Sequence, residues 1–382
     1  MKVYFISRGY PTTEYKMHGI FEMDQAIALA KAGVDVVFLS LDLRSFRRRR
    51  KLGRHCFVRE GVKVYSLDWP IGKVPKSLFY RIGAIALNKL YEEVSAIEGR
   101  PEVLHAYFTD YAYLAAGLKR RTGIPLVVTE PNSHINVDEI QPTLRKAAAA
   151  AYEAADVLIS VSPDFQRKLQ AKFGVDSIVN SILPDLDLFE YREKKPSETF
   201  TIVSTGRLSP LKGMRELIEA LAEAFPQDPK VKLIIFGGGP EEDSLRALIQ
   251  EKGLTDRVDL RGMVHREEIA KGYGEGDLFC LYSHMETFGL AYLEALAAGL
   301  PVLSSACGGP EHLIHEGNGK LIPLFDHSVF VEALREMRNQ IGRYDGAQIS
   351  REAKQSYSVE KITGRVIDCY HQAIRGNEEE KQ

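Results

Sequence analysis

The sequence predicts an α/β protein made of two domains of similar size, each a mainly parallel sheet covered by helices. Short apolar runs with the length of buried strands alternate with longer segments of helical periodicity along the chain. The 382 residues exceed what one ordinary hydrophobic core organises, so two domains are expected. A polar stretch at residues 185–199, containing EKKPSE, separates two halves that repeat the same order of elements.

The first half alternates strands with helices from its first residues. Strands are expected at 2–7, 34–41, 103–108, 126–130 and 156–162, and helices at 20–31 and 163–173, and residues 177–183 end this half. The loop after the first strand contains Gly19 and lies at the carboxyl end of the sheet, where such folds bind ligands. It holds no GxGxxG motif, which disfavours a dinucleotide site.

The second half starts the same pattern again. Strands are expected at 200–205, 231–236, 258–260, 278–282, 302–305 and 320–323, with a helix at 214–225. A last helix at 358–375 is expected to pack back on the first domain. The predicted division is therefore an N-terminal domain at 1–187, a second domain at 188–355, and a returning helix with a polar tail at 356–382.

The composition is that of a cytoplasmic globular protein. Hydrophobic residues make up 45% and charged residues 27%, and the net charge of −2 gives no reason to expect nucleic acid as a partner. The four cysteines show no metal-binding spacing, so reduced thiols and no metal site are expected. The N-terminus lacks the pattern of a signal peptide, and no apolar run approaches the roughly 20 residues of a membrane span.

Two basic segments leave alternatives open. Residues 44–54 read RSFRRRRKLGR. This basic run is expected to form either a solvated loop or a contact with an anionic membrane surface or an anionic acceptor. Residues 73–97 interleave basic and apolar side chains, as in an interfacial amphipathic helix or a core helix with basic ends. The core role is slightly favoured, and peripheral association with the inner membrane face stays a hypothesis.

The most informative stretch is 283–302, SHMETFGLAYLEALAAGLPV, which follows an apolar strand. A helix is expected there, with Thr287 as its N-cap and a Gly-Leu-Pro stop. Phe288, Gly289 and Leu290 would then offer free backbone N–H groups. Such groups, together with the helix dipole, form an anion site.

Two carboxylates flank this expected anion site. Glu286 precedes the helix, and Glu294 lies on its second turn with a side chain that leans back toward the N-terminus. An anion flanked by groups that accept from hydroxyls fits the diphosphate and sugars of a nucleotide sugar. The alternative is an ordinary capped helix whose two glutamates are solvated.

Two further loops leave strand ends on the same side. Residues 206–213, GRLSPLKG, carry Arg207 and Lys212, which can grip a phosphate. Cations are disfavoured at a helix start, so an anion is expected to join them. Residues 237–240, GGGP, allow close backbone approach of a ligand at Gly238, although such turns are common.

Together these motifs resemble the retaining glycosyltransferases of family 4, which have the GT-B fold of two Rossmann-like domains facing each other across a cleft. The 206–213 loop is similar to the family's G-R-x-x-x-x-K-G, and Glu286 and Glu294 match its E-x7-E signature. GGGP, RGMV at 261–264 and CGGPEHL at 307–313 follow in the family's order.

The resemblance implies transfer of a hexose, with retained configuration, from a nucleotide-diphosphate sugar to a glycan or lipid-linked acceptor in cell-envelope polysaccharide or glycoconjugate synthesis. UDP-sugars are expected before GDP-sugars, and no cofactor or metal is expected. The implied catalytic residues are Glu286, Arg207, Lys212 and His134. The implied donor-binding residues are Gly19, Gly206, Arg207, Lys212, Gly238, Val264, Glu286, Thr287, Phe288, Gly289, Leu290 and Glu294, with Val264 beside the base and Glu294 on the ribose.

One position departs from the family pattern. Many relatives carry a histidine after the strand that corresponds to 126–130, where this chain has Pro131, and His134 is the candidate substitute. A loop histidine without a role is the alternative. Other functions also remain open: a phosphorylase or sugar-nucleotide epimerase of the same fold, or a non-catalytic module that binds a sugar nucleotide.

Overall fold

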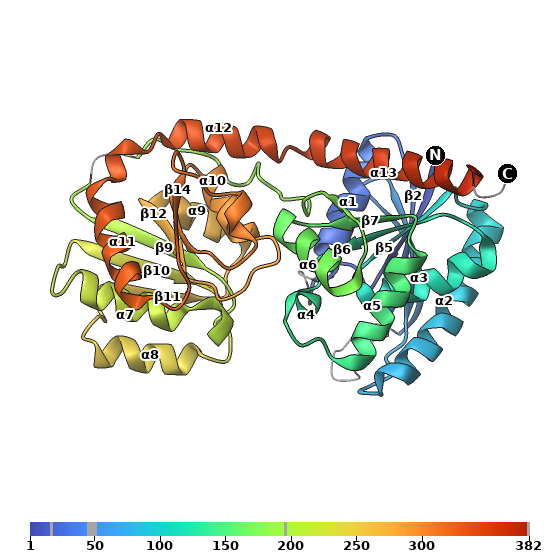
Figure 1. Cartoon of the computed structure of the whole chain (residues 1–382), viewed down its shortest axis with the longest axis horizontal. Coiled ribbons are helices and arrows are strands. Elements are labelled where there is room, and N and C mark those ends of the chain that lie inside the picture. Colours follow the sequence, from blue (N-terminus) through green and yellow to red (C-terminus); the bar gives the residue numbers. More distant parts are fainter. Residues whose placement is uncertain (16–17, 44–51, 195–196, 380–382) are drawn as a thin grey trace. The chain divides into compact units, whose positions relative to one another are not determined.

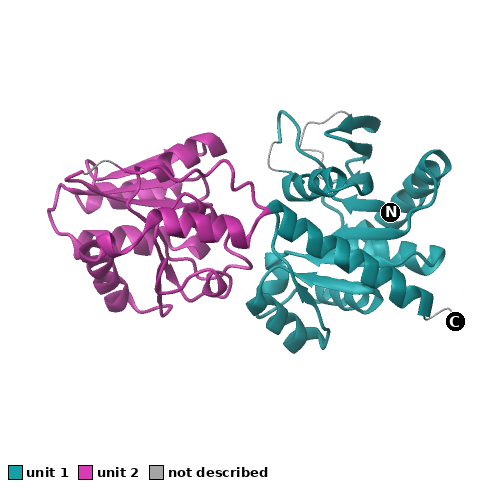
Figure 2. Cartoon of the chain, turned by 90° about the horizontal axis from the view of Figure 1, so that it is seen from above, with its two compact units in different colours: residues 1–183, 359–382 teal, residues 184–358 magenta. Residues whose placement is uncertain are grey.

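The computed structural model describes residues 1–15, 18–43, 52–194 and 197–379. The chain forms two compact units, unit 1 at Met1–Leu183 and Val359–Gln382 and unit 2 at Pro184–Ser358 (Figure 2). Each unit is built around a mainly parallel sheet, which confirms the predicted fold class. The last segment of the chain belongs to unit 1.

Unit 1 contains an eight-stranded sheet in its described residues, in the order β3-β4-β2-β1-β5-β6-β7-β8 (Figure 1). Strand β3 pairs antiparallel with β4, and the other neighbours are parallel. The strands are β1 (Lys2–Ser7), β2 (Asp35–Asp42), β3 (Gly53–Arg59), β4 (Val62–Asp68), β5 (Val103–Tyr107), β6 (Leu126–Glu130), β7 (Val157–Ser160) and β8 (Ile178–Val179).

Helices cover both faces of this sheet (Figure 1). One face carries α1 (Ile20–Lys31) and α13 (Val359–Glu379), and the other carries α2 (Lys76–Glu98), α3 (Thr109–Thr122) and α5 (Pro142–Ala154). A short helix α4 (Ser133–Asn136) lies in the β6–α5 connection, and α6 (Pro163–Phe173) packs against β7 and β8.

The core of unit 1 is centred on Phe5 of β1, which is fully buried. Its ring stacks on Phe38 of β2 and Tyr107 of β5, with centroid distances of 5.6 and 5.4 Å. Rings of this size bury large apolar areas, so the three central strands are held by aromatic contacts as well as by the hydrogen-bond ladder.

The hairpin of β3 and β4 was not predicted, because its outer strand alternates exposed and half-buried residues and lacks an apolar run. Most of the basic run, 44–51, lies outside the described residues. Arg54 lies in β3 rather than in a loop, and its guanidinium pairs with Glu93 of α2 at 2.7 Å.

Helix α2 has the core role that the sequence favoured. Tyr80 and Leu87 are buried, while Leu78 and Ile85 are 42% and 65% exposed. No helix among the described residues combines the length and hydropathy that a membrane span requires.

Unit 2 contains a six-stranded, fully parallel sheet in the order β11-β10-β9-β12-β13-β14. The strands are β9 (Phe200–Thr205), β10 (Val231–Phe236), β11 (Val258–Gly262), β12 (Leu278–Leu281), β13 (Val302–Ser305) and β14 (Gly319–Ile322). One face carries α7 (Met214–Ala224), α8 (Glu242–Glu251) and α11 (His327–Asn339), and the other α9 (Arg266–Glu275), α10 (Leu290–Ala297) and α12 (Gly346–Ser356).

A buried polar contact ties α13 to the sheet of unit 1. The Nδ1 atom of His105 lies 2.6 Å from the hydroxyl of Tyr370, and its Nε2 lies 2.8 Å from the hydroxyl of Thr129. Burial lowers the pKa of His105 to about 3, so the ring is neutral at physiological pH. A neutral imidazole has one donor and one acceptor, and both are used here.

We expect Tyr370→Phe to reduce the free energy of unfolding by about 1–3 kcal/mol, because it leaves a buried ring nitrogen of His105 without its partner. Denaturant unfolding of the full chain measures the change. Tyr191→Phe is the control, since Tyr191 is 39% exposed and its hydroxyl makes no hydrogen bond with a described residue. Equal stability of the two variants would mean that the contact between Tyr370 and His105 does not help to hold α13.

Candidate functional site

The predicted site loops of unit 2 lie where the strand order of its sheet reverses. The chain leaves β9 toward β10 on one side, and it leaves β12 toward β13 on the other. Loops that diverge from the carboxyl ends of neighbouring parallel strands open a crevice between them, which is the usual ligand site of such sheets. Residues 206–213 and 282–289 are these two loops.

Close backbone contacts hold these loops together. At Gly213, which has φ 61°, a Cβ atom would lie 1.9 Å from the carbonyl oxygen of Tyr282. At Gly237, a Cβ atom would lie 1.8 Å from the carbonyl oxygen of Gly206. No side chain fits at such distances, so Gly213 of GRLSPLKG and Gly237 of GGGP are required by the packing of the loops against each other.

Hydrogen bonds add to this contact. The carbonyl oxygen of Leu211 accepts from the hydroxyl of Ser283 at 3.0 Å and from the backbone N–H of His284 at 2.8 Å. The Nε2 of His284 lies 2.9 Å from an oxygen of Glu216 in α7. The loop after β12 is thereby fixed to the loop after β9 and to the helix that follows it.

The two loops bring Lys212 and Glu286 together. The Nζ of Lys212 lies 2.5 Å from Oε1 of Glu286, and the two side chains are 25% and 13% exposed. The backbone of Glu286 is itself held, because its N–H donates to Cys307 and its carbonyl accepts from Gly309. Gly309 is needed here, since a Cβ atom would lie 2.8 Å from Cβ of Glu286.

The start of helix α10 differs from the prediction. Gly289, with φ 98° and ψ 48°, is the residue that precedes the helix, so Thr287 is not its N-cap and Phe288 lies before it. A glycine is favoured there because the left-handed conformation costs other residues free energy. Leu290 is the first helical residue, and the first N–H groups of a helix have no acceptor within it.

Glu294 is buried, and its partner is a residue that sequence reasoning missed. Its Oε1 lies 2.6 Å from Nη2 of Arg266, the first residue of α9. Burial raises the pKa of Glu294, and the charge of Arg266 opposes that rise. For Arg207 and Lys212, the argument was that a cation at a helix start indicates a bound anion. The same argument, applied to α9, would have singled out Arg266 as well.

The other predicted residues of unit 2 lie around these pairs. Arg207 is exposed and forms no ion pair with a described residue. Gly238 packs under Met263, where a Cβ atom would lie 2.7 Å from Cγ of Met263. Met263 itself is 86% exposed, and Val264 beside it is half-buried. Gly206 donates its N–H to Phe236 across the strand ends.

Gly19 and His134 belong to unit 1. Gly19 precedes α1 with φ 69°, and a Cβ atom there would lie 2.2 Å from the carbonyl oxygen of Gly9. In the same region the buried carboxylate of Glu22 pairs with Arg8 at 3.1 Å, and burial raises its pKa. Neither residue was singled out from the sequence, although Glu22 is an acidic residue in the first turn of the helix.

His134 lies beyond the end of β6, in α4, and is exposed. Its backbone N–H donates to the side chain of Asn132 at 3.0 Å. The nearby buried carboxylate is Glu130, which accepts from the hydroxyls of Thr109 at 2.6 Å and Tyr152 at 2.8 Å and from the N–H of Asn132 at 2.9 Å. Glu130 therefore fixes the start of the segment that presents His134.

Within the described parts of the chain, no three histidine, cysteine, aspartate or glutamate side chains are grouped so that they could hold a metal ion.

The close contact of Gly213 gives a first prediction for the site. Gly213→Ala should lower the free energy of unfolding by about 2 kcal/mol or more beyond the effect of Gly253→Ala. Gly253 is a matched control, because its φ is 65° and a Cβ atom added there would meet nothing within 4 Å, so only the left-handed conformation costs about 1–2 kcal/mol. Denaturant unfolding compares the two, and an equal loss would rule out the steric argument.

Glu130 gives a pH prediction. Burial raises its pKa from 4.5 to about 7, so the folded protein binds a proton that the unfolded chain has released between these pH values. Stability from this group is fully present below pH 4.5 and is lost as pH rises through 7, by about 3 kcal/mol. Glu130→Gln removes that loss, because its side chain does not titrate. The unfolding free energy of the variant, relative to that of wild type, should therefore rise between pH 5 and pH 8.

Equilibrium unfolding at the two pH values measures this gain. Exposed Glu153→Gln serves as the control and should follow wild type at both. If the difference between Glu130→Gln and wild type stays constant with pH, the carboxyl titrates outside this range.

Comparison with known proteins matches both halves of the chain. The family model described as "Glycosyl transferase 4-like domain" matches residues 23–184, and the one described as "Glycosyl transferases group 1" matches residues 188–351. The second match contains the Lys212–Glu286 and Arg266–Glu294 pairs.

Similar proteins span nearly the same length. The D-inositol 3-phosphate glycosyltransferase of Paenarthrobacter aurescens is 25% identical, over 92% of this chain and 91% of that protein. A putative teichuronic acid biosynthesis glycosyltransferase of Bacillus subtilis, TuaC, is 27% identical over 91% and 90%. Anabaena HepE, solved in complex with UDP, superposes with a TM-score of 0.71 at 21% identity, over 96% of this chain and 98% of that one. The chain belongs to the group 1, or family 4, glycosyltransferases and has their GT-B fold.

Proposed function

We propose that this glycosyltransferase moves a hexose from a nucleotide-diphosphate sugar, first of all a UDP-sugar, to a glycan or lipid-linked acceptor, with the anomeric configuration retained. The observation that carries the proposal is the Lys212–Glu286 pair, held at 2.5 Å where the loops after β9 and β12 meet. It combines a cation for a phosphate with a carboxylate for sugar hydroxyls in one place.

The diphosphate would be bound by Lys212, Arg207 and the backbone N–H groups near Leu290. The ammonium group of Lys212 has three N–H donors, so it can stay paired with Glu286 and also bind a phosphate oxygen. Arg207 forms no ion pair with a described residue and is available for a bidentate contact. The dipole of α10 favours an anion at the same end.

The nucleoside would lie on the other side of this centre. Glu294, buried and fixed by Arg266, would accept from the ribose hydroxyls, and the exposed side chain of Met263, with Val264, would flank the base. Arg266 is a positioning residue in this scheme, because it sets the direction of the Glu294 carboxylate.

Transfer breaks the bond between C1 of the hexose and the diphosphate oxygen and forms a bond between C1 and an acceptor oxygen. The acceptor's hydroxyl proton passes to the departing diphosphate, so atoms and charge balance without a cofactor. Negative charge grows on the diphosphate as the bond breaks, and fixed cations then stabilise the transition state more than the ground state. Glu286 would orient the hexose, and no metal is required.

The acceptor would be bound by unit 1, with Gly19 and His134 facing it. The names of the relatives support a glycoconjugate or cell-envelope polysaccharide product, and UDP bound to HepE supports a uridine nucleotide as donor. We place the reaction in the cytoplasm, at or near the inner membrane face, where nucleotide sugars meet growing envelope glycans.

The test is release of nucleotide from a panel of UDP-, GDP- and ADP-hexoses with EDTA present, with and without envelope glycans. We expect one UDP-hexose to be turned over by wild type, and Lys212→Ala or Glu286→Ala to reduce turnover about 100-fold or more. Lys230→Ala is the matched control, because it removes an exposed ion pair with Glu198 at the other end of β10.

Other outcomes would contradict the proposal. Inverted anomeric configuration in the NMR spectrum of the product would exclude retention, and loss of activity in EDTA would exclude a metal-free site. Sugar phosphate formed from a glycoside and orthophosphate would identify a phosphorylase. Conversion of the donor sugar to its epimer in the absence of acceptor would identify an epimerase. Nucleotide binding without turnover of any donor and acceptor pair would identify a binding module.

A further inference from the structure

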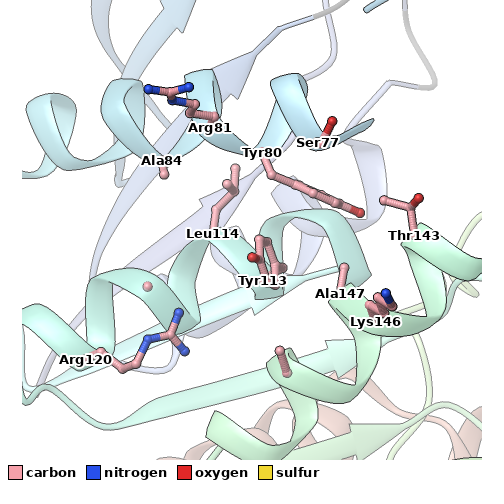
Figure 3. A pocket seen from close by; sticks show the side chains of 12 residues that line it. Ser77, Tyr80, Arg81, Ala84, Tyr113, Leu114, Arg120, Thr143, Lys146 and Ala147 are labelled. Atoms are coloured by element: carbon pink, nitrogen blue, oxygen red, sulfur yellow. The ribbon is translucent and has the colours of Figure 1, made fainter. Parts of the chain in front are cut away.

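A groove on the outer helical layer of unit 1 has no part in the proposed donor site. It lies between α2, α3 and α5 and has a volume of about 500 Å³ (Figure 3). All three helices belong to the compact unit 1. A hollow of this size is within the range of small-ligand sites, which raises the question of what its lining could bind.

The lining carries positive charge from each of the three helices. Arg81 comes from α2, Arg120 from α3 and Lys146 from α5, and no lining residue is acidic. None of the three forms an ion pair with a described residue. The carboxylate of Asp110 is not part of the lining, and it forms an ion pair with Lys76, whose Nζ lies 2.5 Å from Oδ2 of Asp110. Three like charges around one hollow attract an anion, because their potentials add.

The rest of the lining is aromatic, apolar and hydroxylic. The rings of Tyr80 and Tyr113 lie 4.7 Å apart, and the hydroxyl of Tyr80 is fixed by Asp110 at 2.7 Å. Leu114 lies beside them (Figure 3). A tyrosine ring offers an apolar face to the C–H groups of a sugar ring while its hydroxyl can bond the sugar's own hydroxyls. Cations beside such rings fit a sugar that carries a phosphate or carboxylate.

The groove also has a direction. Helices α2, α3 and α5 all follow strands whose carboxyl ends form one edge of the sheet. Ser77 and Thr143 lie in the first turns of α2 and α5, at that edge, and Arg120 lies near the end of α3, away from it (Figure 3). Gly19 and His134 follow strand ends at the same edge. A chain lying in the groove would therefore lead to the edge where the acceptor is expected.

We propose that this groove is a subsite for an anionic glycan, which holds the part of the acceptor behind the reacting sugar. Its phosphate or carboxylate groups pair with Arg81, Arg120 and Lys146, and one of its rings packs on Tyr113. The acceptor role rests on the proposed function, whereas binding of the anionic glycan does not. Open lining with hydroxyls at one end favours a glycan over a hydrocarbon chain, which would need an enclosed apolar channel.

The test measures binding of the full chain to a fluorescent galacturonic acid hexamer, with neutral maltohexaose as comparison. Arg81→Gln/Arg120→Gln/Lys146→Gln should weaken hexamer binding about tenfold or more. The matched control is Lys31→Gln/Arg167→Gln/Arg375→Gln, which removes three exposed cations of unit 1 outside the groove. Tyr113→Ala should weaken binding without changing its dependence on salt, whereas the triple groove variant should flatten that dependence.

The outcomes separate the groove from the proposed function. Hydrolysis of the donor without acceptor, where wild type shows it, should be equal in wild type and groove variants. Absence of donor turnover in wild type both with and without acceptor would count against the proposed function, while hexamer binding still reports on the groove. Equal hexamer affinity in groove and control triples, or equal affinity for maltohexaose, would overturn the subsite. The groove would be assigned to a lipid surface instead if wild type bound phosphatidylglycerol vesicles but not the hexamer, and if the triple groove variant lost the vesicle binding.

Discussion

The site of unit 2 depends on backbone contacts that exclude any side chain. The loops after β9, β10 and β12 approach each other so closely that Gly213 and Gly237 have no space for a Cβ atom. Because these loops leave strands on both sides of the point where the sheet order reverses, their contact fixes how the loops are arranged at that point. The positions of the side chains on these loops, including those of Lys212 and Glu286, therefore depend on that contact.

Lys212 and Glu286 show what this fixed geometry achieves. They come from different loops, and each is mostly shielded from water, so their charges interact more strongly than on an open surface. Before a donor binds, each compensates the other. The proposed diphosphate would bring additional negative charge, and the exposed Arg207 would be available to pair with it. The site can then receive an anion without leaving a buried charge unpaired.

The sequence predicted most of this architecture because its signals are local. Strand ends, glycine loops and the E-x7-E spacing are read from neighbouring residues, so Lys212, Glu286 and Glu294 were all expected in the site. Local patterns failed where a tertiary contact decides. Gly289 replaces Thr287 at the start of α10 because a left-handed turn is needed there, and Arg266 meets Glu294 only through packing of α9 against the sheet. The hairpin of β3 and β4 was missed because its outer strand carries no apolar run.

The two units position their candidate site residues by different kinds of contact. Unit 2 fixes its loops by glycines and backbone hydrogen bonds, so most substitutions there would disturb the fold of the site itself. In unit 1, Gly19 makes a similar backbone contact, but a side chain, Glu130, fixes the segment of His134, and side chains of three separate helices supply the cations of the groove. Side chains on helix surfaces can change without moving a backbone. If unit 2 binds the donor and unit 1 the acceptor, as proposed, backbone contacts would fix the loops that carry the donor-binding side chains, whereas the groove could change by side-chain substitution alone.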